Sequence, residues 1–192
     1  QRFVRDYVAL THGSFKLHAK WGYAASIRGT IRAGIDRSGY YRTKRVEIHP
    51  GGEDSITQYE CLAEYKSSNG SRYTLLHLRL LTGRTHQIRV HCEFIGLPLV
   101  GDSDYQRNRP PHDPSVTYCR RPFLHKLRFV FPNRRGDPVA IFLPLEDQPD
   151  LYDVLRQLEL TESFDAPAGD RRAAASAAAV PREAARQAWS AY

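Results

Sequence analysis

The sequence predicts an α+β fold, with a mainly antiparallel mixed sheet and a few helices. Two observations carry this prediction. Residues 58–81 hold two runs of strand-forming residues around Asn69-Gly70, which is a strong signal for a β-hairpin. Residues 85–95 then change to a helical period. The chain shows no βαβ alternation and contains neither Gly-x-Gly-x-x-Gly nor Gly-Lys-Ser, so we expect no nucleotide cofactor.

The elements before the hairpin are expected to be short. Residues 3–10 are rich in β-forming residues and predict a strand, and residues 14–48 predict short strands and turns punctuated by glycines. In the first arm of the hairpin, every second residue is apolar or aromatic: Tyr59, Cys61, Ala63 and Tyr65. The second arm, residues 72–81, is apolar on both faces and predicts a central strand.

The helix predicted over Thr85–Ile95 has one apolar face, made by Ile88, His91, Cys92 and Ile95. Thr85 is the predicted N-cap and Gly96 the predicted C-terminal stop. The spacing of His86, His91 and Cys92 matches no zinc pattern, so we expect no metal site and interpret His91 and Cys92 as core residues.

The C-terminal third combines a loop with regular elements. Residues 103–122 form a polar loop that contains four prolines. Strands are predicted over 124–131 and 138–143. A short amphipathic helix follows over Leu151–Leu158, with Asp150 as its N-cap.

At Asp165 the composition changes to alanine and arginine, with few large apolar residues. We therefore predict one domain over 1–164 and a tail or appended helix over 165–192. The arginines and Trp189 of this tail could dock on a protein partner or RNA, and a disordered tail is the alternative.

The overall composition excludes some classes of protein. The 192 residues are 41% hydrophobic and 26% charged, and no apolar run approaches about 18 residues, so no membrane span is predicted. Three cysteines are too few for a disulfide framework and predict a reducing intracellular compartment, cytoplasmic or organellar. The chain has no methionine and begins at Gln1, so we expect it to be part of a longer translation product.

The net charge of +7 is confined to the first quarter of the chain. Residues 1–50 hold ten Lys or Arg against three Asp or Glu, whereas the other 142 residues hold eighteen of each. Basic and aromatic residues interleave there, which suits phosphate contacts and base stacking; a solvated sheet edge is the alternative. The candidate RNA-binding residues of this region are Lys20, Trp21, Arg28, Arg32, Arg37, Arg42, Lys44 and Arg45.

The segment Leu81-Thr-Gly-Arg-Thr-His-Gln-Ile-Arg-Val-His91 joins the predicted buried strand to the helix N-terminus. An arginine held at this position, Arg84, can bind a carboxylate or a phosphate through two parallel hydrogen bonds. The alternative is an exposed arginine that precedes the helix.

Residues 80–91, followed by Gly96-x-Pro98-Leu99-x-Gly101-Asp102-x-x-Tyr105, resemble the RluA-type family of RNA pseudouridine synthases. Arg5-x-Tyr7-x-Ala9 is similar to an earlier block of that family, and Arg121-Pro-x-Leu-His125 to a later one. The resemblance runs from about Phe3 to Leu160, so 1–164 is interpreted as a partial domain of this family.

The resemblance implies isomerisation of uridine to pseudouridine in a structured RNA, rRNA or tRNA, without cofactor or metal. Arg84 matches the arginine that pairs with the catalytic aspartate. Tyr7 matches the tyrosine that stacks on the target base, and Ile88 the aliphatic residue that lines the base pocket. We also include His86 and Arg89 among the RNA-binding candidates.

The family's aspartate block, His-Arg-Leu-Asp-x-x-Thr-Ser-Gly, has no match in these residues. Asp36 follows the Tyr7 strand instead of preceding it and is interpreted as a turn residue. Where the family has a lysine next to Gly52, this chain has Glu53. We therefore expect the aspartate on an upstream segment or a second chain. The alternative is an inactive RNA-binding or structural component of a ribosome or an assembly particle, with ribosomal proteins as partners.

Overall fold

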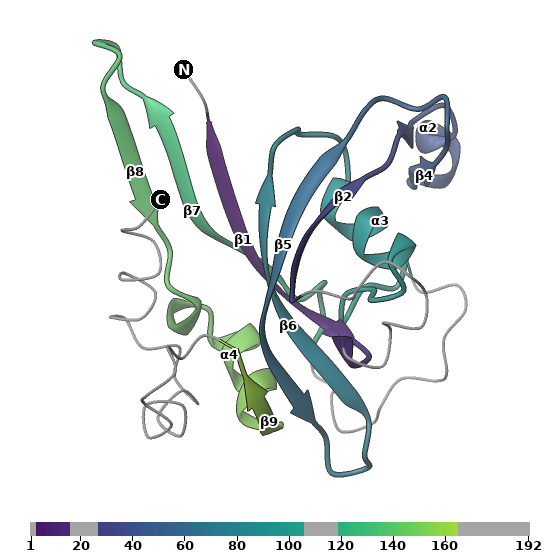
Figure 1. Cartoon of the computed structure of the whole chain (residues 1–192), viewed down its shortest axis with the longest axis vertical. Helices are drawn as coiled ribbons and strands as arrows, with labels where there is room; N and C mark the ends of the chain where they lie inside the picture. The colour runs from purple at the N-terminus through teal and green to yellow at the C-terminus, as the bar shows by residue number, and fades with distance from the viewer. Residues whose placement is uncertain (1–2, 16–26, 106–118, 165–192) are drawn as a thin grey trace.

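The computed structural model describes residues 3–15, 27–105 and 119–164. It is an α+β structure, as predicted, in which a seven-stranded sheet has the order β2-β5-β6-β1-β7-β8 and β9 pairs with β5. All strand pairings among the described residues are antiparallel, and β3 and β4 form a separate two-stranded sheet (Figure 1). The strands are β1 (Val4–His12), β2 (Arg28–Arg32), β3 (Ile35–Asp36), β4 (Glu47–Ile48), β5 (Ile56–Lys66), β6 (Arg72–Leu80), β7 (Leu124–Pro132), β8 (Pro138–Phe142) and β9 (Glu159–Ser163). The helices are α2 (Tyr40–Thr43), α3 (Gln87–Phe94), the 3-10 turn η3 (Leu145–Asp147) and α4 (Pro149–Arg156).

The predicted hairpin is β5–β6, and β6 lies between β5 and β1, which confirms it as a central strand. Its turn places Gly70 at φ +90°, a conformation that glycine adopts without a steric penalty. A bulge in β5 between Cys61 and Ala63 changes the alternation that the sequence suggested. Tyr59 and Cys61 pack on the α3 side of the sheet, whereas Ala63 and Tyr65 pack on the α4 side. One extra residue in a strand reverses the face of every residue that follows.

Both faces of the central strands are therefore buried. Val8 and Leu10 of β1 contact a core that includes α4, and Tyr7 and Ala9 contact a second core that includes α3. The two helices cover opposite faces, so the side chain of Tyr7 lies on the α3 side. Within the described residues, no helix is long and apolar enough to span a membrane.

The helix α3 begins later than its sequence predicts. His86, at φ 52°, takes the N-cap position without a side-chain cap bond, so the prediction of Thr85 as N-cap is wrong. The end is as predicted: Gly96 has φ 79°, and the amides of Gly96 and Leu97 donate to the carbonyls of Glu93 and Cys92. This double closure is a Schellman motif, which glycine permits.

The C-terminal elements follow the prediction with two differences. The strands β7 and β8 confirm the two predicted ones, but Gln148 occupies the N-cap of α4 and Pro149 opens the helix. Asp150 is not the cap; its carboxylate accepts a hydrogen bond of 2.7 Å from Arg121 Nε. Strand β9 was not predicted. The predicted tail, most of the loop over 103–122, Lys20 and Trp21 lie outside the described residues.

Candidate active site at the Thr82–Arg84 turn

Residues 81–86 connect β6 to α3. Gln87, the first residue of α3, holds the Thr82–Arg84 turn of this connection in place. Gln87 is 2% exposed, and its side-chain oxygen accepts hydrogen bonds from Thr82 Oγ1 (2.9 Å) and from the amide of Arg84 (3.0 Å). Its side-chain nitrogen donates to the Ile56 carbonyl and to Thr57 Oγ1, both at 3.0 Å. The buried amide therefore fixes the backbone of Arg84 to strand β5.

Thr57 extends this network to His91. Its hydroxyl lies 2.9 Å from His91 Nδ1, and His91 Nε2 lies 3.4 Å from the Ala33 carbonyl. Burial lowers the pKa of His91 to about 4, so the ring is neutral at pH 7. His91 and Cys92 are fully buried, which confirms their interpretation as core residues.

The guanidinium of Arg84 forms an ion pair with Glu53, at 2.6 Å between Nη1 and Oε2. The backbone of Glu53 is held by two hydrogen bonds with Ile35, of 2.9 and 3.0 Å. The Arg84 side chain is 38% exposed and that of Glu53 50%. Arg84 thus stands on a rigid turn with its charged end accessible, and a further carboxylate or phosphate can reach it.

Arg5, Tyr7 and Ile88 lie on the same side of the sheet as this turn. A Cβ atom at Gly83 would collide with the Arg5 guanidinium, so β1 and the turn are in direct contact. Ile88 is 4% exposed in the α3 core, and the Tyr7 ring packs against that core. The Lys126 ammonium lies over the Tyr7 ring, 5.7 Å from its centroid. The structure therefore brings the three predicted catalytic positions, Arg84, Tyr7 and Ile88, to one side of one sheet.

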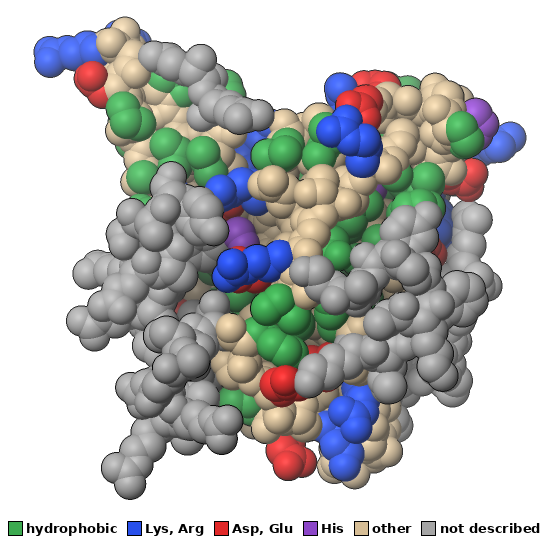
Figure 2. All heavy atoms as spheres, viewed as in Figure 1, with side chains coloured by type: hydrophobic (Ala, Val, Ile, Leu, Met, Phe, Trp, Pro, Cys, Tyr) green, Lys and Arg blue, Asp and Glu red, His purple; other side chains and the backbone are tan. Residues whose placement is uncertain are grey.

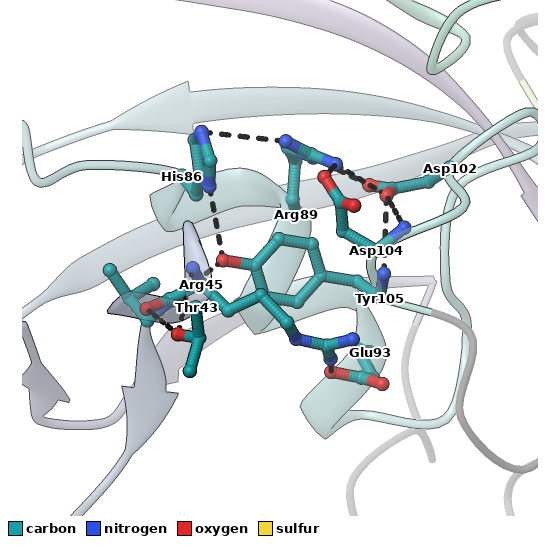
Figure 3. A network of polar contacts seen from close by, with 9 residues as sticks. Thr43, Arg45, His86, Arg89, Glu93, Asp102, Asp104 and Tyr105 are labelled. Carbon is teal, nitrogen blue, oxygen red and sulfur yellow. Dashed lines mark hydrogen bonds and ion pairs between the residues drawn. The ribbon is translucent and has the colours of Figure 1, made fainter. Parts of the chain in front are cut away.

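Arg89, five residues beyond Arg84, is bound inside the protein (Figure 3). Its guanidinium donates to both oxygens of the fully buried Asp102, at 2.6 and 2.7 Å, and to Asp104 at 2.7 Å. These hydrogen bonds to Asp102 and Asp104 raise the pKa of Arg89 above its usual range. We call Arg89, Asp102 and Asp104 the Arg89 cluster; an RNA contact by Arg89 stays a prediction.

Tyr105 lies between two arginines and joins the cluster to the neighbouring loop. The guanidinium carbons of Arg45 and Arg89 lie 4.7 and 4.8 Å from the centre of its ring. Its hydroxyl accepts a hydrogen bond of 2.9 Å from the Val46 amide and lies 3.0 Å from His86 Nδ1 (Figure 3). Burial, together with the nearby positive charge of Arg89, lowers the pKa of His86.

The RNA-binding candidates of the basic first quarter that the structure describes fall into two groups. On the edge strand β2, Arg28 pairs with Glu60, and Arg32 with Asp54 at 3.4 Å. The second group surrounds α2, where the side chains of Arg37, Arg42 and Lys44 are exposed and Arg45 is partly buried against Glu93. Asp36 accepts two hydrogen bonds from Ser38, as a turn residue does.

Sequence reasoning missed three residues that organise the site: Gln87, Glu53 and Tyr105. Gln87 stands inside the motif, and a polar residue at the start of an amphipathic helix was the available signal. Glu53 and Tyr105 act through contacts distant in sequence, which no local pattern reveals. Within the described ranges, no group of three or more His, Cys, Asp or Glu side chains is placed to bind a metal ion.

Comparisons with known proteins identify the family and the fold. The family described as RNA pseudouridylate synthase matches residues 1–94. The chain is 36% identical over 140 residues to ribosomal large subunit pseudouridine synthase D of Haemophilus influenzae, covering 68% of this chain and 40% of the relative. It is 45% identical over 166 residues to the protein of the same name from Nitrosomonas europaea, covering 82% of this chain and 43% of the relative.

A solved structure, human RNA pseudouridylate synthase domain containing 1, superposes with a TM-score of 0.63 at 25% identity, over 92% of this chain and 66% of that one. The chain therefore belongs to the RluA-type family of RNA pseudouridine synthases. It spans about two fifths of the length of the curated relatives described above.

Proposed function

We propose that this chain supplies the arginine-bearing half of the active site of an RNA pseudouridine synthase. The observation that carries the proposal is the accessible Arg84 guanidinium, held on a turn that lies on the same side of the sheet as Tyr7 and Ile88. The reaction breaks the N1–C1′ bond of a uridine, forms a C5–C1′ bond, and exchanges the C5 hydrogen for a hydrogen on N1. A base must leave the RNA stack for this chemistry.

The residues of the site suit three tasks in that reaction. Arg84 holds the catalytic aspartate, which we place on a segment outside residues 1–192, in its ionised form. The Tyr7 ring offers a surface on which the flipped base stacks and a hydroxyl that can accept a proton. The Ile88 side chain closes the floor of the pocket. Because both curated relatives act on the ribosomal large subunit by name, we propose rRNA as the first substrate to test.

The test measures tritium released from RNA labelled at uridine C5, with the full-length protein and large-subunit rRNA or tRNA transcripts. We expect Arg84→Ala to lower the rate by about a hundredfold or more, because the aspartate loses its positioning charge. RNA affinity should change little.

Arg135→Ala is the matched control, because Arg135 is an exposed arginine in the β7–β8 turn, remote in the fold from the Thr82–Arg84 turn. Unchanged tritium release by Arg84→Ala would contradict the proposal that Arg84 belongs to the active site. The placement of Arg84, Tyr7 and Ile88 on one side of the sheet supports the enzyme over the alternative of an inactive binding module. The expected partners beyond RNA, and the compartment, stay predictions.

A further inference from the structure

The loop between β3 and β4 carries a compact charged surface, which we call the α2 knob and define as residues 37–44. In Figure 1 it lies near the upper end of β2 and β5, in the direction of α3. Its cations Arg37, Arg42 and Lys44 are exposed, and they pair with no carboxylate among the described residues. This distinguishes them from Arg28 and Arg32 on β2, whose guanidinium groups already have acidic partners.

The two adjacent tyrosines of the knob have different environments. Tyr40 is partly buried, with its ring edge-on to the His86 ring at 5.7 Å between centroids. Arg37 and Lys44 lie over the Tyr40 ring, each at 5.9 Å from its centroid. Tyr41 is 81% exposed, more than any other large hydrophobic side chain of the described residues. A solvent-exposed ring on a segment that also carries three exposed cations is suited to stack on a partner that is itself aromatic and anionic.

Hydrogen bonds within residues 37–44 hold the backbone of the knob in a closed turn. The Lys44 amide donates to the Tyr40 carbonyl at 2.7 Å, and Thr43 Oγ1 donates to the Gly39 carbonyl at 3.0 Å. Lys44 ends the turn of helix at φ 57°. The backbone at Tyr41 is therefore held in a closed turn, which lowers the entropy lost when a ligand binds.

Three contacts attach the knob to the Arg84 turn. Ile35, just before the knob, is hydrogen bonded to Glu53, which pairs with Arg84. Tyr40 contacts His86, two residues after Arg84. Val46, just after the knob, donates to the Tyr105 hydroxyl, which in turn contacts His86. The knob and the Arg84 turn consequently have a defined relative position.

We infer that Tyr41 stacks on an unpaired base of the substrate RNA, beside the uridine that enters the Arg84 site, while Arg37, Arg42 and Lys44 contact the flanking phosphates. This inference rests on the proposed function. Single-stranded RNA fits the knob better than a protein partner, because each base presents a flat face and each linkage a negative charge. Tyr40 positions the knob and does not contact RNA.

The experiment measures binding of the full-length protein to a fluorescent RNA hairpin with an unpaired uridine-rich loop. A blunt RNA duplex of the same composition is the comparison probe. We expect Tyr41→Ala to weaken hairpin binding by roughly 5- to 150-fold, the range for loss of one base stack, and to leave duplex binding unchanged. Tyr41→Phe should retain the affinity of the natural protein because it retains the ring.

Two further variants separate stacking from charge and from general exposure. Phe142→Ala removes another exposed ring, 54% exposed on β8, and should leave hairpin affinity unchanged. Arg42→Ala should reduce the slope of log affinity against log salt by about 0.7, whereas Tyr41→Ala should keep that slope.

Equal hairpin affinity of Tyr41→Ala and the natural protein would overturn the inference, and if pseudouridine still forms, the proposed function stands without it. Loss of affinity for duplex and hairpin alike would also overturn it, because stacking on an unpaired base would then not be the cause. A protein that binds neither probe and forms no pseudouridine would overturn both proposals. Binding of a protein partner that depends on Tyr41, with RNA affinity unaffected, would reassign the knob.

Discussion

Arg84 and Arg89 belong to one short segment, yet they serve different purposes. Arg84 lies on a turn, and among the described residues its ion-pair partner is the half-exposed Glu53; the Arg84 side chain itself is 38% exposed. Arg89 lies on α3, is 15% exposed, and is held by two carboxylates, of which Asp102 is fully buried. Burial of the partner, and not residue type, therefore separates an arginine that can bind a new ligand from one that stabilises the fold.

The largest expected effect is on the Arg89 cluster. Arg89→Met leaves the buried Asp102 carboxylate without its cation, so we expect the free energy of unfolding to fall by about 3–5 kcal/mol. Urea denaturation measures this loss. Arg84→Ala, which breaks an exposed pair, should cost less than about 1 kcal/mol in the same assay. Adding Asp102→Asn to Arg89→Met should recover part of the stability, and equal costs for the two arginines would contradict the comparison.

The second effect concerns pH and the buried network behind the turn. Burial lowers the pKa of His91 in the folded protein to about 4, below its value of 6.5 in an unfolded chain. The unfolded state therefore binds more protons between these values, and stability that is present above pH 6.5 is lost as the pH falls towards 4. We expect a loss of roughly 2 kcal/mol between about pH 7.5 and pH 5.

Urea denaturation at the two pH values gives the measurement. His91→Gln has no titrating ring and should show a smaller dependence over this range. The same slope in both proteins would assign the pH dependence to other groups.

The third effect is expected at Gln87, where a substitution should lower both the stability of the fold and the activity that depends on the Arg84 turn. Gln87→Met removes four hydrogen bonds while keeping a side chain of similar size, so we expect a loss of about 1–3 kcal/mol in stability. Because Gln87 holds the Arg84 amide, the rate of tritium release should fall as well, at temperatures where the variant is folded. A destabilised variant with full activity would show that the turn does not need this support.

The smallest effect is expected at Glu53. Glu53→Gln removes an exposed ion pair and should change stability by less than about 1 kcal/mol. It also removes a carboxylate that competes for Arg84, so kcat/KM for RNA should rise. The rise should be at most about fivefold, which corresponds to the interaction energy of about 1 kcal/mol for an exposed ion pair. Glu53→Asp keeps the charge and serves as the control. A fall in kcat/KM for Glu53→Gln would instead show that Glu53 positions Arg84 for catalysis.

Much of the molecule was predictable because it depends on local chemistry. The Asn69-Gly70 turn, the stop at Gly96 and the apolar spacing of Ile88 and Cys92 are set by backbone conformation and periodicity within a few residues. The motif around Arg84 was likewise sufficient to identify the family and to place the arginine at a strand–helix junction. For these features the sequence by itself determined the outcome.

Tertiary contacts decided the rest. The bulge in β5 divides its apolar residues between two cores. His86, whose ring packs against Tyr105 and Tyr40, stands at the start of α3 in place of Thr85. The choice of partner for Arg84 was also made by the fold, which brings Glu53 to the turn from 31 positions away. The sequence determines the charge and the hydrogen-bonding capacity of each side chain. Which groups come into contact, and which of them are buried, depends on the packing of segments that are distant in the sequence.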